Sequence, residues 1–471
     1  MIPVLTTEQM QAVDRAAPEP VDVLIGRAGR AVAAGALALL GGTYGRRVVV
    51  VAGKGNNGAD GRAAAAVLAR RGVKVTVLDA ATLAGGERLP TADLVIDAAY
   101  GTGFRGSYHP PDPGGAAVLA VDIPSGLAGD TGTPGRDDGE TAAGAVTGAG
   151  DVALRAATTV TFAAYKPGLL LGEGPARAGA VTVADIGLGP GVEERCTSWL
   201  VEDADVARWV PPRPRGAHKW QSAALVVAGS PGMMGAPSLV SRAAMRAGAG
   251  YVRLGVPGAT LVSLPSGEAV GTPLPQDWAD AAVAEAERCR VMVIGPGLGR
   301  GPATDVAVGR ALEAAPLPVV VDADGLNALT GAQLASIAGR RSHPTVVTPH
   351  DGEYTRLAGQ PPGPDRLADV RRLAATTGAI VLLKGPTTVV AHPDGRALLA
   401  AAGSARLATA GTGDVLSGVI GAFVARGVEP FHATALAAHV HGRAARLGLA
   451  EGLVAGDLPE LVARWLSGER P

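Results

Sequence analysis

The chain has 471 residues, of which 47% are hydrophobic and 18% are charged, and its formal net charge is −1. This length predicts two domains of about 200 to 250 residues each, and the composition is that of a packed globular protein rather than a disordered one. The near-zero charge gives no electrostatic reason to expect nucleic acid or an anionic membrane as a partner. A small molecule is therefore the expected substrate.

The cysteines and the N-terminal residues indicate in which cellular compartment the protein is expected. Cys196 and Cys289 lie far apart without metal-ligand spacing, which argues against a disulfide framework or a zinc site and fits a reducing cytoplasm. Residues 1–17 lack the basic and then apolar pattern of a signal peptide. No apolar run reaches the length of about 18 residues expected of a membrane span, and the most hydrophobic stretch, 31–42, has the length of a buried helix. We therefore expect a cytoplasmic protein without a membrane segment.

Short apolar segments rich in β-branched residues alternate with Ala-rich helical segments along the whole chain. Strands of this kind, separated by helices, imply parallel sheets that are covered on both faces. The pattern restarts after Pro211, so the expected fold is α/β with two doubly wound domains. The expected strands are 47–52, 73–79, 93–99, 117–123 and 159–164 in the first half, and 224–229, 251–257, 291–295, 318–324, 345–349 and 379–385 in the second.

Residues 209–218, WVPPRPRGAH, contain three prolines and no apolar periodicity. Such a segment is typical of an exposed and fairly stiff connector. We therefore expect domains at 1–208 and 219–471, joined by a linker at 209–218.

The first expected strand is followed by the glycine-rich sequence GKGNNG, residues 53–58, and Asp79 ends the next strand. This is the arrangement of a dinucleotide-binding turn, although a chain with 68 glycines matches Gly-x-Gly-x-x-Gly by chance. The polar residues of this segment are more informative. Asn56, Asn57 and Asp60 follow the end of a strand, where such folds bind ligands, and the alternative is that they only cap a helix.

Two further strands end in carboxylates, Asp97 and Asp122. Because the carboxyl ends of parallel strands meet at one edge of a sheet, Asn57, Asp97, Asp122 and Ser125 are expected to share a pocket of oxygen ligands. Such a pocket suits a hard cation. Taken singly, each aspartate is equally well explained as a turn residue.

The motifs GKGNNGADG, DAAYGTGFRG, VDIPSG and TVTFAAYKPG together resemble the N-terminal domain of bifunctional NAD(P)H-hydrate repair enzymes. This domain is a Rossmann-like epimerase that acts on damaged nicotinamide nucleotides, and the resemblance spans roughly residues 1–205. It implies a potassium ion held by Asn57, Asp97 and Ser125, with Asp122 as the acid/base carboxylate. The substrate contacts that it implies are Asn56, Asn57, Gly58, Ala59, Asp60, Gly101, Thr102, Gly103, Phe104, Arg105, Gly106 and Ser107.

The sequence ATAGTGDVLSGVIGAF, residues 408–423, places one carboxylate, Asp414, where an apolar helix begins. The backbone N–H groups of a glycine-rich helix start bind phosphate, so Gly411 and Gly413 would allow a phosphoryl group to approach and Thr412 would add a hydroxyl. A carboxylate beside phosphate makes sense as a base that takes a proton from a hydroxyl attacking phosphorus. The alternative is that Asp414 is only a helix N-cap.

Six motifs in the second half resemble, in order, the ribokinase-like NAD(P)H-hydrate dehydratase. They are VVAGSPGMMGAPSLVSRAAMRAGAGYVRL (226–254), VIGPGLG (293–299), VDADGLNAL (321–329), TPHDGEYTRL (348–357), LLKGPTTVV (382–390) and GTGDVLSG (411–418). The resemblance implies that the S hydrate is dehydrated to NADH or NADPH, with Mg²⁺ and with ADP giving AMP and phosphate. Asp414 would deprotonate the ring hydroxyl, which attacks the terminal phosphoryl group. The implied hydrate contacts are Ala236, Gly297 and His350, and the implied nucleotide contacts are Lys384, Gly385, Pro386, Thr387, Thr388 and Gly413.

Two alternatives stay open at this point. The second half is also consistent with a ribokinase-like kinase of a small molecule, and the first half with a degenerate nucleotide-binding module. The expected ligands are NADH or NADPH hydrates and ADP or ATP, with no nucleic acid and no membrane. The family resemblance further implies a homo-oligomer.

Overall fold

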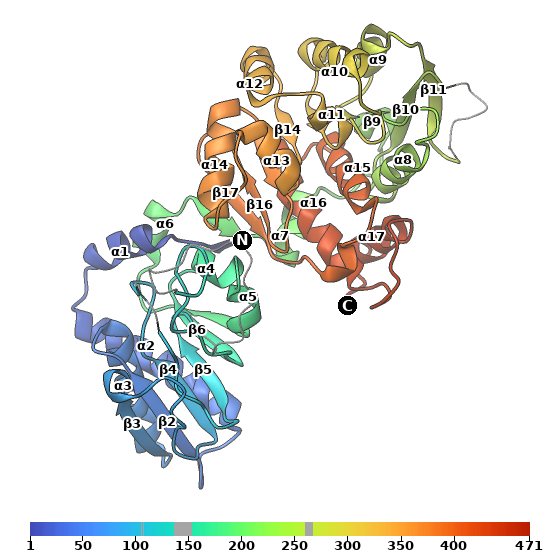
Figure 1. Ribbon diagram of the computed structural model, residues 1–471. Helices are drawn as coiled ribbons and strands as arrows, with labels where there is room; N and C mark the ends of the chain where they lie inside the picture. The colour runs from blue at the N-terminus through green and yellow to red at the C-terminus, as the bar shows by residue number, and fades with distance from the viewer. Residues whose placement is uncertain (105, 107, 136–152, 260–266) are drawn as a thin grey trace. The chain divides into compact units, whose positions relative to one another are not determined.

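The structure is a computed structural model that describes residues 1–104, 106, 108–135, 153–259 and 267–471 (Figure 1). The chain forms two compact units, one of Ile2–Thr197 and one of Met1 with Ser198–Pro471. The boundary therefore differs from the expected one at residue 208. The short strand β8 (Ser198–Leu200) pairs with β17 (Ala397–Ala400), and α7 (Asp203–Trp209) packs on α16 (Pro430–Ala445), so the proline-rich segment lies inside the second unit and is no linker between the two.

The first unit is built on a parallel sheet with the strand order β3-β2-β4-β5-β6-β7. Its strands are β2 (Arg47–Ala52), β3 (Lys74–Asp79), β4 (Leu94–Ala98), β5 (Ala117–Val121), β6 (Thr158–Phe162) and β7 (Ala180–Ala184), and β1 (Ile2–Pro3) precedes them. After β3 the chain crosses β2 to form β4, so the strand order changes direction there. In open α/β sheets this is the place where ligands bind, at the carboxyl ends of the strands.

Both faces of this sheet are buried, as expected from the apolar strands. One face packs on helices through residues such as Val50, Ile96 and Leu119, and the other face buries Val49, Val51 and Val95. The helices of the unit are α1 (Thr7–Arg15), α2 (Val21–Leu40), α3 (Asn56–Arg70), α4 (Pro167–Leu170), α5 (Gly174–Arg177) and α6 (Gly189–Arg195), with a short 3₁₀ turn η1 (Ala80–Thr82).

Helix α2 is longer than the apolar stretch 31–42 suggested. Among the described residues it is the one helix that is long and apolar enough to cross a membrane, with a mean hydropathy of 1.6. The core helices of globular proteins meet the same test, so this is weak evidence for a span. In the structure α2 buries Leu24, Val32, Ala36 and Leu40 in the core that it shares with α3.

The second unit has a larger sheet, in which the strands follow the order β8-β17-β16-β15-β14-β13-β12-β9-β10-β11. The strands expected in this half are confirmed as β9, β10 and β12 to β15, with ends shifted by a few residues. The strands β8, β11, β16 and β17 were not expected from the sequence. The bounds are β9 (Ala223–Val227), β10 (Tyr251–Pro257), β11 (Val270–Leu274), β12 (Val291–Ile294), β13 (Val319–Val321), β14 (Thr345–Val347), β15 (Ile380–Leu383) and β16 (Thr388–Ala391).

The strands from β9 to β15 pair in parallel, while β16 pairs antiparallel with β15 and β17. The remaining helices are α8 (Gly235–Arg246), α9 (Ala279–Ala286), α10 (Pro302–Ala314), α11 (Asp324–Asn327), α12 (Gly331–Arg340), α13 (Asp351–Ala358), α14 (Arg366–Thr377), α15 (Thr412–Ala425) and α17 (Leu458–Leu466), with the 3₁₀ turns η2 (Lys219–Ser222) and η4 (Ala405–Leu407).

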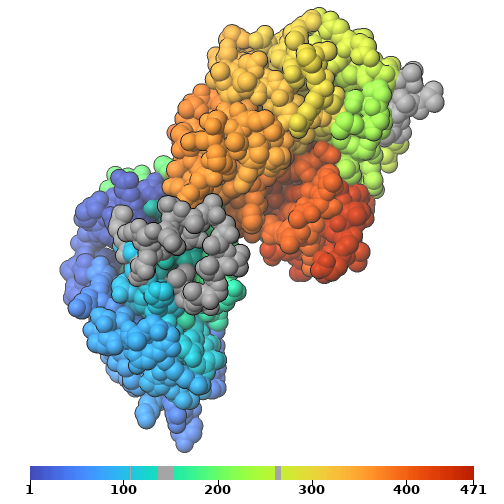
Figure 2. Space-filling view, viewed as in Figure 1, coloured from blue at the N-terminus to red at the C-terminus, as the bar shows by residue number. Residues whose placement is uncertain are grey.

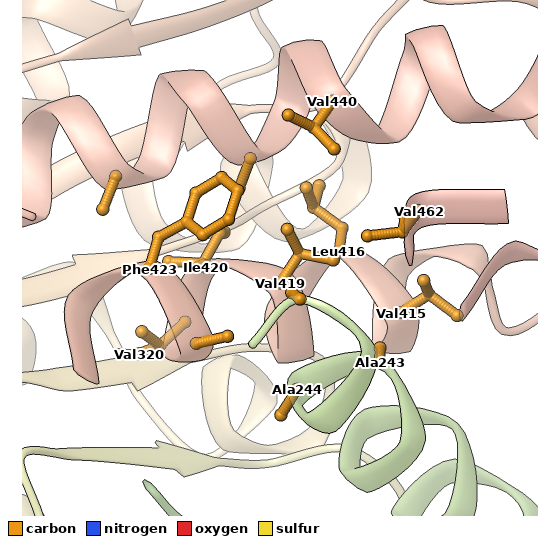
Figure 3. Packing of buried hydrophobic residues seen from close by; sticks show 14 of the residues in the cluster. Ala243, Ala244, Val320, Val415, Leu416, Val419, Ile420, Phe423, Val440 and Val462 are labelled. Atoms are coloured by element: carbon orange, nitrogen blue, oxygen red, sulfur yellow. The ribbon is translucent and has the colours of Figure 1, made fainter. Parts of the chain in front are cut away.

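Helix α15 runs through the core of the second unit. Val415, Val419, Ile420 and Phe423 point into a cluster that includes Val440 of α16 and neighbouring residues of α8 and the sheet (Figure 3). Helices α16 and α17, in the orange to red part of the chain in Figure 2, pack on each other beside it. Because α15 is almost completely buried, its first turn is held in a fixed position relative to the strand ends.

Candidate functional site

A cavity of about 580 Å³ opens at the carboxyl ends of the strands in the first unit. It is lined by the loop Gly53–Asn57 after β2, by Ala99–Phe104 after β4, and by residues of α1 and α2. The glycines of this loop are needed for close packing. A β-carbon on Gly58 would lie 1.9 Å from the carbonyl oxygen of Gly53, so only glycine fits where α3 begins beside β2.

The three expected potassium ligands gather around the end of β4. Asp97 is completely buried, and its carboxylate accepts hydrogen bonds from the Ser125 hydroxyl at 2.6 Å and the Ser125 backbone N–H at 2.8 Å. No cationic side chain in the described part of the chain pairs with Asp97, and burial raises its pKa. The Asn57 side chain lies against Gly101, and both polar atoms of its amide are buried without a hydrogen-bond partner among the described residues.

Asp122 lies at the same edge of the sheet and is held by a residue that the sequence reading did not select. The ammonium of Lys166, which is only 1% exposed, donates to Asp122 Oδ1 at 2.5 Å and to Thr161 Oγ1 at 2.8 Å. The backbone of Asp122 has φ 65°, a conformation that is uncommon outside glycine and that directs its side chain toward Thr161 and Lys166. Lys166 belongs to the motif TVTFAAYKPG, but no local pattern links it to Asp122, which lies 44 positions earlier in the chain.

Two more carboxylates line this cavity, Asp60 near the start of α3 and Asp14 at the end of α1. Burial raises the pKa of Asp60 to about 8, and the charges of Asp122 and Asp14 add to that effect. Burial also raises the pKa of Asp14. Asp60 was expected as a ligand contact, whereas no motif or spacing around Asp14 indicates a role in the site.

The other expected substrate contacts of this unit are partly brought together. Asn56 and Asn57 line the cavity, and so do Gly101, Thr102, Gly103 and Phe104. Gly58 and Ala59 lie behind them in the first turn of α3, and Gly106 does not line the cavity. Arg105 and Ser107 lie outside the described residues.

In the second unit, Asp414 occupies the first turn of α15. The N-cap of this helix is Gly411 at φ 88°, where a β-carbon would come within 2.6 Å of Leu239, so the alternative that Asp414 is the N-cap is wrong. No side chain caps this helix start. Burial, strengthened by the nearby charges of Asp322 and Asp324 and opposed by Lys384, raises the pKa of Asp414 to about 6.

A buried ionic network lies beside Asp414 and was not predicted as a unit. Asp322, at the end of β13, is 1% exposed and accepts hydrogen bonds from Lys384 Nζ at 2.6 Å, Ser417 Oγ at 2.7 Å and Thr348 Oγ1 at 2.7 Å. Burial opposes its ionisation, but Lys384 and these hydrogen bonds outweigh burial and hold the pKa of Asp322 below its usual value. Asp322 thus ties β14, β15 and α15 together at the strand ends.

Several expected contacts of the second unit do meet. Lys384 lies beside Gly413, because its Nζ is 3.4 Å from the position that a β-carbon on Gly413 would take. Gly297 likewise lies against Ala236, because a β-carbon on Gly297 would be 3.1 Å from the Ala236 methyl group. Residues Gly385, Pro386 and Thr387 form the turn from β15 to β16, which starts at Thr388.

Two other expected contacts have structural partners. His350 is exposed and caps α13, where its Nδ1 accepts a hydrogen bond from the Gly352 N–H at 2.9 Å. The Thr412 hydroxyl donates to the carbonyl groups of Leu407 and Thr409 instead of pointing at the open helix start. The expectation that this hydroxyl binds phosphate is therefore not supported by the geometry.

Comparisons with known proteins agree with both halves of this description. A family profile described as NAD(P)H-hydrate dehydratase matches residues 224–467, and one described as YjeF-related protein N-terminus matches residues 21–89 and 79–168. The bifunctional NAD(P)H-hydrate repair enzyme Nnr of Salinibacter ruber is 38% identical over 98% of this chain and 96% of its own length. The enzyme of the same name from Mycobacterium tuberculosis is 39% identical over 84% of this chain and 82% of its own length.

A solved structure, the ADP/ATP-dependent NAD(P)H-hydrate dehydratase from Bacillus subtilis co-crystallized with ATP/Mg²⁺, is 31% identical and covers 57% of this chain and 98% of its own, with a TM-score of 0.48. The family assignment rests on the profiles and the curated relatives, which match both units and nearly the whole length. The chain belongs to the family of bifunctional NAD(P)H-hydrate repair enzymes.

Proposed function

We propose that the chain repairs hydrated nicotinamide nucleotides in two steps. The first unit interconverts the R and S hydrates of NADH and NADPH, and the second unit dehydrates the S hydrate with ADP, giving AMP and phosphate. The observation that carries the proposal is Asp414, a half-buried carboxylate at the open, uncapped start of α15. The kinase alternative is not favoured, because the relatives that match both units along nearly their whole length are named as repair enzymes.

In the second unit, the start of α15 binds the terminal phosphate through its backbone N–H groups. Asp414 takes the proton of the ring hydroxyl, the oxygen attacks the terminal phosphorus, and AMP leaves. The phosphate on the ring is then expelled by the electron pair of the ring nitrogen, and the neighbouring carbon loses a proton to restore the double bond. Lys384, which lies next to Gly413, neutralises part of the charge on the transferring group.

Mg²⁺ accompanies the nucleotide in this proposal. The described residues contain no group of three or more His, Cys, Asp or Glu side chains that would hold a metal by themselves. Mg²⁺ does not need such a group, since proteins commonly hold it through substrate phosphates, water and one or two carboxylates. Bound there, it would neutralise charge on the phosphates.

In the first unit, Asp122 moves the proton that epimerisation requires, and Lys166 holds its carboxylate in place. Potassium fits the residues around β4. The Asn57 amide oxygen is buried and unpartnered, and the Asp97 carboxylate is buried without a cationic partner, so a monovalent cation would satisfy both. Ser125 would complete this set, since its hydroxyl already contacts Asp97.

The test of the proposed function mixes the protein with the R and S hydrates of NADH, with ADP or ATP in separate runs, and follows absorbance of the reduced nicotinamide. Loss of both epimers in potassium buffer, and slower loss of the R epimer in sodium buffer, is the expected result. Rapid loss of the S epimer alone would contradict the epimerase half. A stable phosphorylated product without NADH would contradict the dehydratase half and favour a kinase.

The dehydratase reaction should depend on pH through Asp414. A base must be ionised to accept a proton, and the pKa of Asp414 is about 6. We therefore expect kcat/KM for the S hydrate to be constant above about pH 7 and to fall about tenfold per pH unit below about pH 6. Initial rates between pH 5 and 8 measure this profile, and a flat profile would contradict the role of Asp414 as the base.

The homo-oligomeric state stays a prediction from the family resemblance, and the cytoplasmic location stays a prediction from the cysteine usage and the N-terminal residues. Sedimentation of the purified chain measures the first of these directly.

A further inference from the structure

Asp79 is a residue of the glycine-rich dinucleotide pattern that the proposed function leaves unused. It ends β3, which pairs in parallel with β2 so that Asp79 lies opposite Ala52, immediately before the loop Gly53–Asn57. Asp79, Ala80 and Ala81 line the same cavity as that loop and as Asp122. The cavity therefore extends along the carboxyl edge of the sheet from β3 to β5.

The carboxylate of Asp79 has a fixed orientation and an open side. Its Oδ1 accepts a hydrogen bond from the Ala81 N–H at 2.9 Å and thereby caps the turn η1. Its Oδ2 has no hydrogen bond or ion pair among the described residues, and the side chain is exposed. One oxygen is thus held by the backbone while the other is available to a ligand.

The order of the strands indicates how a dinucleotide would lie in this cavity. This orientation rests on the proposed epimerase function. The reacting ring belongs beside Asp122 at the end of β5. The diphosphate fits the start of α3, whose N-cap is Gly55 without a side-chain cap and whose preceding residue, Lys54, also lines the cavity. The adenosine end then reaches β3, because β5 and β3 are three strand spacings apart, about 14 Å.

We propose that Asp79 accepts a hydrogen bond from the 2′-hydroxyl of the adenosine ribose and makes the epimerase site select NADH hydrate over NADPH hydrate. A carboxylate at the end of the second strand binds a ribose diol in dinucleotide-binding folds, whereas a 2′-phosphate at that position requires a cation. Lys166 is engaged by Asp122 at the β5 end of the cavity, and Lys54 belongs to the loop before α3 that would hold the diphosphate. Among the described residues that line the cavity, Lys54 and Lys166 are the only lysines or arginines, so the 2′-phosphate would face Asp79 without a further cation from this set.

The experiment uses the full chain without ADP or ATP, so that the dehydratase unit has no co-substrate. Pure S hydrate of NADH or of NADPH is added, and the appearance of the R epimer is followed by chromatography above the uncatalysed rate. We expect kcat/KM for NADH hydrate to exceed that for NADPH hydrate by about tenfold or more, because the Asp79 carboxylate would repel the negatively charged 2′-phosphate of NADPH hydrate. Asp79→Asn keeps the cap of η1 and removes the charge, so it should raise the value for NADPH hydrate and bring the ratio near one.

The matched control is Asp93→Asn, which removes one negative charge at the amino ends of the same strands, where Asp93 pairs with Arg46. This variant should keep the ratio of the wild-type protein. Equal use of both hydrates by the wild-type protein, or an unchanged ratio in Asp79→Asn, would overturn the inference and leave the epimerase function intact. If the wild-type protein epimerises neither hydrate, the proposed function itself fails.

Discussion

Asp414→Asn should reduce dehydration of the S hydrate by about 10² to 10⁴-fold in kcat. The amide has the shape of the carboxylate but cannot accept the proton of the ring hydroxyl, so the oxygen is not activated for attack on phosphorus. The same variant should still interconvert the R and S hydrates, because the epimerase residues belong to the other compact unit. NADH formation and the epimer ratio, measured on one preparation, separate these two activities.

The control for this variant is Asp305→Asn, which removes an exposed carboxylate from the first turn of another helix, α10. It should leave NADH formation unchanged. Binding of adenine nucleotide should persist in Asp414→Asn, since the backbone N–H groups of α15 are kept. Dehydration at the wild-type rate in Asp414→Asn would show that another group is the base.

Asp322→Ala should lower the free energy of unfolding of the second unit by about 3 to 5 kcal/mol. The substitution removes at once the carboxylate that pairs with the half-buried Lys384 ammonium and that accepts hydrogen bonds from the Ser417 and Thr348 hydroxyls. A half-buried ammonium would then lose its carboxylate partner, while the Ser417 and Thr348 hydroxyls would keep only their backbone acceptors, the carbonyl groups of Gly413 and Val321. All five tryptophans, Trp199, Trp209, Trp220, Trp278 and Trp465, belong to the second unit, so urea unfolding followed by their fluorescence reports this unit alone.

Asp394→Ala is the matched control, because Asp394 forms an exposed ion pair with Arg396 in the turn between β16 and β17. Its effect should stay within about 1 kcal/mol, as for other surface pairs. The double variant Asp322→Leu with Lys384→Met removes both charges and should recover part of the lost stability, although dehydration should stay impaired without Lys384. A loss below about 1 kcal/mol in Asp322→Ala would mean that the network does not hold the strand ends together.

Much of the fold and many of the site residues could be predicted because their signals are local. Apolar runs such as 47–52 and 291–295 alternate with helical segments, and this alternation of strands and helices by itself predicts parallel sheets. Asn57 and Asp122 follow strands along the chain and Asp97 is the last residue but one of β4, so their meeting at one edge of the sheet follows from topology. Asp414 is likewise recognisable from the glycines around it.

The remaining features depend on contacts between residues far apart in the chain. Lys166 contacts Asp122 across 44 positions and Lys384 contacts Asp322 across 62, and no periodic pattern marks such pairs. The expected boundary at residue 208 differs from the observed one at Thr197, because residues 198–200 form the strand β8 only by pairing with the distant strand β17. The sequence by itself determined which chemical groups stand at the strand ends. Only the tertiary structure decided which of them are paired, buried or open, because burial and pairing depend on neighbours that the chain brings together by folding.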